Sequence, residues 1–69
     1  MTRRLLPYGE RGLLVECVDL TEVLGLLRSL QQSPPGELAE IVPGARTLFL
    51  RTRERPSDSL REALLELQP

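Results

Sequence analysis

The feature that most constrains this chain is a short pattern that occurs twice. Leu5 to Glu16 reads LLPYGERGLLVE, and Ile41 to Arg51 reads IVPGARTLFLR. With one gap at Tyr8, both copies have two apolar residues and a proline, then a glycine, an arginine and an apolar run. A segment with apolar residues at helical spacing follows each copy. The chain therefore reads as one strand-turn-strand-helix unit written twice, over residues 3–33 and 37–68.

Four runs are strand candidates: Arg3–Leu6, Leu13–Val18, Glu37–Val42 and Thr47–Arg53. Successive side chains of a strand point to opposite faces. In the second run, one face has Leu13, Val15 and Cys17, and the other has Leu14, Glu16 and Val18. In the third, Leu38, Glu40 and Val42 oppose Ala39 and Ile41. In the fourth, Leu48, Leu50 and Thr52 oppose Thr47, Phe49, Arg51 and Arg53.

Two helices are expected, each with a capping signal at its start. Asp19 and Glu22 have the spacing of a capping box, and this helix runs to about Gln32. Gly25 within it is expected to allow close approach to the sheet. The second helix runs to about Gln68, with Ser57, Asp58 and Ser59 as competing N-caps and Ser59 to Glu62 as a second box. The predicted apolar stripes are Leu20, Val23, Leu24 and Leu27, and then Leu60, Ala63, Leu64 and Leu67.

The predicted fold is α+β, a two-layer ββαββα arrangement with a four-stranded antiparallel sheet and two helices on one face. One layer of helices covers only one face of a sheet. The other face is expected to carry Leu14, Val18 and Phe49 among Glu16, Arg51 and Arg53. An apolar patch with a charged rim on so small a sheet usually packs against something else.

Length, charge and cysteine content narrow the class of protein. The 69 residues make one domain, 1–69, with a net charge of −1 and no His. A single cysteine, Cys17, excludes an internal disulfide framework and indicates a cytoplasmic setting. No run is apolar enough for a membrane span, and no zinc site is expected. The balanced charge gives no nucleic-acid footprint.

The sequence contains no recognisable set of catalytic residues. The turns Gly9–Gly12 and Pro43–Arg46 fit either anion-binding turns with an arginine fork or plain hairpins, and we favour the hairpins. Cys17 has no His to activate it, which favours a buried apolar role. The glutamate pairs Glu10 with Glu16 and Glu37 with Glu40 have no shared concave site in a sheet this small, so they are interpreted as solvated.

Arg51, Arg53 and Arg55 form a basic stripe on the last strand, with Arg46 near its start. It lacks the exposed aromatics and the excess positive charge that nucleic-acid binding requires. Pairing with Glu16 across strands, or with a protein partner, is the favoured interpretation.

At LLPYGERGLLVE and VPGARTLFLR the chain resembles the N-terminal domain of the bacterial allophanate hydrolase subunit 1 family. This family includes the B-type subunit of 5-oxoprolinase and a sporulation kinase inhibitor. The match runs over nearly the whole chain and falls on Gly9, Glu10, Leu13–Glu16, Val42–Pro43, Arg46–Thr47 and Leu48–Leu50. Two positions depart from the family pattern. Gly12 stands where the family commonly has Ala, and Arg51-Thr52-Arg53 replaces an aromatic-Asp-Pro ending.

Family members are longer and carry a C-terminal cyclophilin-like barrel, so the resemblance implies the N-terminal domain of a two-domain subunit. It implies a non-catalytic assembly domain that joins the C-type subunit of 5-oxoprolinase, or the barrel, in an ATP-dependent amide-bond hydrolase. ATP is implied only for that whole complex, and no cofactor for this chain. The alternative is a regulatory module that inhibits a sensor histidine kinase by direct binding. A third possibility is a free-standing domain that dimerises through the uncovered sheet face.

The candidate interface residues come from both the resemblance and the predicted fold. Glu10 and Arg46 are motif positions in the two turns, and they are candidates for a shared site. The uncovered face supplies Leu14, Val18, Phe49 and Arg51.

Overall fold

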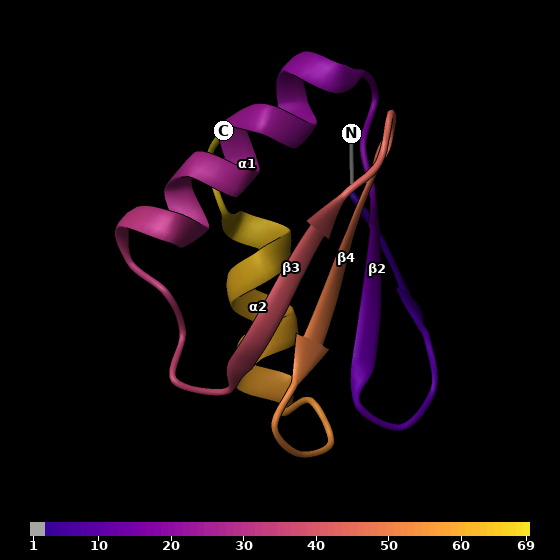
Figure 1. Ribbon diagram of the computed structural model, residues 1–69, viewed down its shortest axis with the longest axis vertical. Helices are drawn as coiled ribbons and strands as arrows, with labels where there is room; N and C mark the ends of the chain where they lie inside the picture. Colours follow the sequence, from indigo (N-terminus) through magenta and orange to yellow (C-terminus); the bar gives the residue numbers. More distant parts are fainter. Residues whose placement is uncertain (1–2) are drawn as a thin grey trace.

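The computed structural model describes residues 3–69 and has the predicted ββαββα order (Figure 1). Its elements are β1 (Arg4–Pro7), β2 (Gly12–Glu16), α1 (Leu20–Gln32), β3 (Leu38–Pro43), β4 (Thr47–Thr52) and α2 (Asp58–Glu66). The four strands form one antiparallel sheet in the order β1-β2-β4-β3. The two strands of each hairpin are therefore neighbours in the sheet. The two ββα units meet where β2 pairs with β4.

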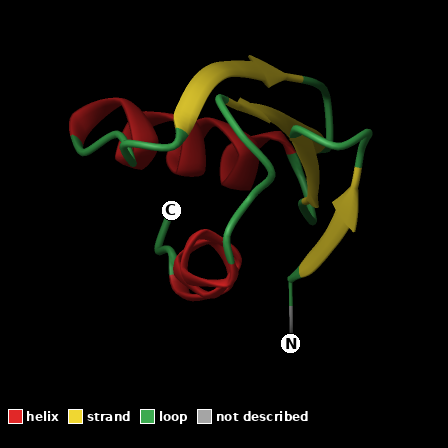
Figure 2. Cartoon of the chain, turned by 90° about the horizontal axis from the view of Figure 1, so that it is seen from below, coloured by secondary structure: helices red, strands yellow, loops and turns green. Residues whose placement is uncertain are grey.

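Both helices lie on the same side of the sheet, as predicted (Figure 2). The predicted alternation is confirmed in the two central strands, where Leu13, Val15, Leu48 and Leu50 are at most 1% exposed. These side chains form one core with buried residues of the helices: Val23, Leu26, Leu30, Leu60 and Leu64. Such a continuous apolar layer supplies most of the free energy of folding in a domain of this size.

The predicted start of α1 is confirmed, with one change in its hydrogen bonding. The Asp19 carboxylate accepts a hydrogen bond from the backbone N–H of Glu22 at 2.9 Å. The Glu22 carboxylate accepts from the N–H of Val18 at 2.8 Å, one residue before the cap. The exchange of bonds therefore ties the end of β2, as well as the cap, to the first turn of α1.

The start of α2 differs from the predicted second capping box. Ser57 is the N-cap, and its Oγ accepts from the N–H of Leu60 at 3.1 Å. Ser59 lies inside the first turn of α2, so the predicted capping box between Ser59 and Glu62 is wrong. The hydroxyl of Ser57 also donates to Glu37 at 2.5 Å. That contact with the segment before β3 favours Ser57 over Asp58 and Ser59 as the N-cap of α2.

The predicted apolar stripes are partly wrong. In α1, Leu20 is 52% and Leu24 is 47% exposed, whereas Leu26 and Leu30 are buried with Val23. Ala63 of α2 is also exposed. The helix is rich enough in leucine to offer two overlapping stripes, and the packing of α1 across the sheet decides which of them is covered.

The strict alternation predicted for β3 is wrong because the strand has a register shift between Leu38 and Glu40. The extra residue puts both Leu38 and Ile41 against the core, although they are three positions apart. Beyond the shift, Val42 pairs with Phe49 and returns to the outer face.

Gly25 permits a close contact, but the contact is not with the sheet. A Cβ at this position would lie 2.7 Å from the Cβ of Pro69, which packs against α1. Ser29, one turn further along, donates to the carbonyl of Gln68 at 2.9 Å. The glycine therefore makes room for residues 67–69 on the surface of α1.

Candidate interaction surface

A row of four apolar side chains crosses the face of the sheet turned away from the helices. Leu6 pairs with Leu14, Leu14 with Phe49, and Phe49 with Val42, so that each strand contributes one residue. Leu6, Leu14 and Phe49 are half-buried by their neighbours, and Val42 is 46% exposed. We call this set the apolar row and the face that carries it the open face.

Tyr8 and Gly12 extend the apolar row at its centre. Tyr8 is 62% exposed, and its ring lies edge-on to Phe49, with 5.1 Å between ring centroids and 68° between planes. Such edge-to-face pairs are favourable because the positive ring edge meets the negative ring face. A Cβ on Gly12 would clash with the carbonyl oxygen of Tyr8 and would lie 3.0 Å from Cε1 of Phe49. The absence of a side chain at Gly12 therefore lets the two rings meet.

Ion pairs border the apolar row on both sides. Arg4 contacts Glu16 at 3.2 Å, and Arg51 contacts Glu40 at 3.0 Å. All four side chains are well exposed, so each pair contributes little to stability. Their effect is to leave the open face without net charge from these four groups. The predicted pairing of the basic stripe with Glu16 is wrong for Arg51, which pairs with Glu40, and Glu16 pairs with Arg4.

The edges of the sheet are less suited to docking than its open face. Both edge strands, β1 and β3, end in a proline, Pro7 and Pro43. Proline has no N–H to donate to an added strand, and natural sheets use it to block edge pairing. Contact through side chains of the open face is therefore favoured over extension of the sheet.

The structure brings only some of the predicted interface residues together. Leu14, Phe49 and Arg51 lie on the open face. Val18 is 58% exposed, but it follows the end of β2 and lies beside the start of α1.

Glu10 and Arg46 are not brought together. The turn that contains Glu10 lies beside the end of β4, where the N–H of Thr52 donates to the carbonyl of Arg11. The turn that contains Arg46 lies beside the end of β2, where the N–H of Cys17 donates to the Arg46 carbonyl. These turns are at opposite ends of the two central strands, so the two side chains do not form one compact site.

Sequence reasoning missed three members of the open face: Leu6, Tyr8 and Val42. The signal was present for Leu6 and Val42, because they occupy the same place in the two copies of the repeat. Val42 was assigned to the same face as Leu38 because the register shift in β3 has no clear mark in the sequence.

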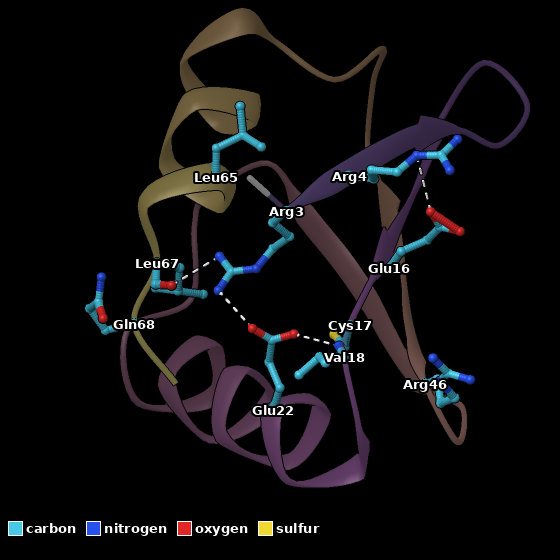
Figure 3. Close-up of a pocket in the computed structure, with 10 residues that line it drawn as sticks. All are labelled: Arg3, Arg4, Glu16, Cys17, Val18, Glu22, Arg46, Leu65, Leu67 and Gln68. Carbon is cyan, nitrogen blue, oxygen red and sulfur yellow. Dashed lines mark hydrogen bonds and ion pairs between the residues drawn. The ribbon is translucent and has the colours of Figure 1, made fainter. Parts of the chain in front are cut away.

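A hollow of about 770 Å³ lies beside the end of β2, between the start of α1 and the end of α2 (Figure 3). Arg3 is its central charged group, and its side chain is only 11% exposed. Arg3 donates to the carbonyls of Leu64 and Leu67 at 2.6 and 2.9 Å and contacts Glu22 at 3.4 Å. The guanidinium is therefore engaged in joining β1, α1 and the end of α2, which makes this hollow a structural junction.

Cys17 lies in the wall of the same hollow and is 8% exposed. Burial raises the pKa of its thiol, and the negative charge of Glu22 raises it further. A thiol held protonated and out of solvent is a poor nucleophile. Within residues 3–69 the structure also has no group of three or more His, Cys, Asp or Glu residues that could hold a metal ion.

None of the helices in the described part of the chain is long and apolar enough to cross a membrane. Comparisons of the sequence and structure with protein-family models, curated proteins and solved structures found no match.

Proposed function

We propose that this chain is a non-catalytic protein-interaction domain that docks through its open face. The observation that carries the proposal is the apolar row, which crosses all four strands with no element of residues 3–69 covering it. Contiguous apolar surface with a polar border is typical of protein–protein contacts. The ion-paired border of Arg4 with Glu16 and Arg51 with Glu40 has this arrangement.

The resemblance to the allophanate hydrolase subunit 1 family supports a more specific proposal. In that proposal the domain helps to assemble an ATP-dependent amide-bond hydrolase, with a protein like the C-type subunit of 5-oxoprolinase as its partner. We call this partner the complementary hydrolase subunit. The alternative, inhibition of a sensor histidine kinase, depends on the same resemblance.

Two surface positions allow a matched test. Val42 on the open face is 46% exposed, and Leu24 on α1 is 47% exposed. Val42→Glu and Leu24→Glu therefore introduce the same charge at equally exposed apolar sites, only one of which belongs to the proposed interface. Both variants are checked for folding by circular dichroism before they are used.

The experiment is a calorimetric titration of the complementary hydrolase subunit into each of the three chains. We expect the wild type and Leu24→Glu to bind, and Val42→Glu to bind at least about tenfold more weakly, because it places a charge in the contact. Absence of binding by the wild type would contradict the hydrolase proposal. Inhibition of histidine kinase autophosphorylation by the wild type and Leu24→Glu, but not Val42→Glu, would then favour the alternative.

A further inference from the structure

The two halves of the open face are related by the sequence repeat. Leu6 and Val42 occupy equivalent places on the two edge strands, and Leu14 and Phe49 occupy equivalent places on the two central strands. From either end the apolar row therefore has one apolar residue on an edge strand, one on each central strand and one on the other edge strand, with Leu6 corresponding to Val42 and Leu14 to Phe49. A two-fold symmetric contact requires a surface that is complementary to its own rotated copy.

The charged residues follow the same relation with their signs reversed. Arg4 lies two residues before Leu6, and Glu40 lies two residues before Val42. Glu16 lies two residues after Leu14, and Arg51 lies two residues after Phe49. In the first half the arginine is therefore on the edge strand and the glutamate on the central strand, and in the second half the two are exchanged.

We propose that a second copy of this chain covers the open face, with the two-fold axis parallel to the strands and midway between β2 and β4. In this arrangement Leu6 of each copy lies over Val42 of the other, and Leu14 lies over Phe49. The arrangement falls within the aligned class of sheet packing, in which strand directions differ by about 30°.

Charge supports this occupant. The residue directly across the interface from each charged side chain of the border is uncharged. The two copies of Glu16, like those of Arg51, lie on either side of the axis, with their charges balanced by Arg4 and Glu40 of the same copy. Arg4 faces the turn at Gly44, Glu16 faces Thr47, and Arg51 faces Gly12. Glu40 faces Tyr8 of the other copy, whose hydroxyl can donate to the carboxylate. The ion pairs already formed within each copy leave no net charge from these groups for a partner to neutralise.

The size of the domain sets the strength of the contact. The Cα trace spans 28 × 23 × 20 Å, so even the whole of the broad face offers no more than the ~800 Å² per partner of a standard-size interface. We therefore expect a weak contact, which keeps the dimer exchangeable. The dimer and a contact with another protein would use the same face, so the dimer would have to dissociate before that protein binds.

The test is sedimentation equilibrium of the wild-type chain alone and of Val42→Glu and Leu24→Glu. The wild type and Leu24→Glu are expected to dimerise with equal affinity, and Val42→Glu to be at least about tenfold weaker. A monomeric wild type at millimolar concentration, or equal dimerisation of all three chains, would overturn the proposal. A wild type that is monomeric but binds the complementary hydrolase subunit, with an affinity that Val42→Glu reduces, contradicts the dimer and supports the proposed function. A wild type that dimerises but does not bind that protein supports the second copy and contradicts the hydrolase proposal.

Cross-linking tests the position of the axis. Facing sheets lie about 10 Å apart, which is too far for a disulfide but within reach of a short bis-maleimide. The double variant Leu6→Cys with Val42→Cys is expected to form a covalent dimer, and each single variant much less, because Leu6 faces Val42 rather than itself. Equal cross-linking of the single Leu6→Cys variant would contradict the proposed axis.

Discussion

Leu14 and Phe49 lie directly opposite each other in the register of β2 and β4, at the centre of the sheet face that no helix of residues 3–69 covers. Their neighbours in sequence, Leu13 and Leu48, point to the other side and are at most 1% exposed. One pair of strands therefore has a face that the fold requires and a face that remains available for contact. The two faces should respond differently to substitution.

Replacing Phe49 with alanine should destabilise the domain less than the same change at Leu48. Phe49 is half-buried and loses chiefly its contact with Tyr8, so we expect about 1–2 kcal/mol. Leu48 is fully buried, and Leu48→Ala should cost about 2–5 kcal/mol, enough to unfold much of so small a domain. Urea unfolding followed by circular dichroism measures both. Equal losses would mean that the open face is part of the core.

Gly12 should not accept a side chain, whereas Gly36 should. Gly12→Ala places a Cβ against the carbonyl of Tyr8 and the ring of Phe49, so the first hairpin must shift. Gly36→Ala meets no atom within 4 Å and should be neutral or stabilising by about 0.4–1 kcal/mol. In thermal unfolding we expect a lower midpoint for the first variant only. A Gly12→Ala protein as stable as the wild type would contradict the described packing of Tyr8.

Arg3 and Arg4 are adjacent arginines with different expected contributions. Arg3→Ala removes two hydrogen bonds to the end of α2 and the contact with Glu22, and we expect a loss of about 1–3 kcal/mol. Arg4→Ala removes only an exposed ion pair and should cost less than about 1 kcal/mol. Chemical denaturation gives the two values, and amide exchange should show faster opening of residues 64–67 in Arg3→Ala alone. The reverse order of losses would refute the junction.

Glu37 should make stability depend on pH in acid. The hydroxyl and then the backbone N–H of Ser57, both donating to the carboxylate, lower its pKa below the ordinary 4.5. Its stabilising effect is therefore complete above pH 4.5 and is lost as the pH falls through the lower folded-state pKa. Glu37→Gln should be less stable than wild type at pH 7, with a difference that narrows below about pH 4.5. A difference that is constant from about pH 7 to pH 3 would show that the charge of Glu37 is not involved.

Much of the fold followed from patterns that are local in the sequence. The repeat indicated the order of elements, and alternation in the central strands identified Leu13, Val15, Leu48 and Leu50 as core. Asp19 was recognisable as an N-cap because its hydrogen bond spans only three residues. These features depend on neighbours within one turn or one strand.

The features that sequence reasoning missed depend on contacts between distant segments. Leu26 replaces Leu24 in the core because of how α1 crosses the sheet, and Gly25 contacts Pro69 rather than a strand. The separation of Glu10 from Arg46 follows from the antiparallel pairing of β2 with β4. No single stretch of the sequence contains that pairing, so the two motif positions do not show by themselves that their turns lie at opposite ends of the sheet.

The most direct test of the open face as a contact surface is a concentration series of methyl chemical shifts by NMR on the wild-type chain. We predict that the methyl groups of Leu6, Leu14 and Val42 shift progressively as the concentration rises, while those of Leu20 and Leu24 on α1 do not. Shifts confined to α1, or none up to millimolar concentration, would contradict self-association through the open face.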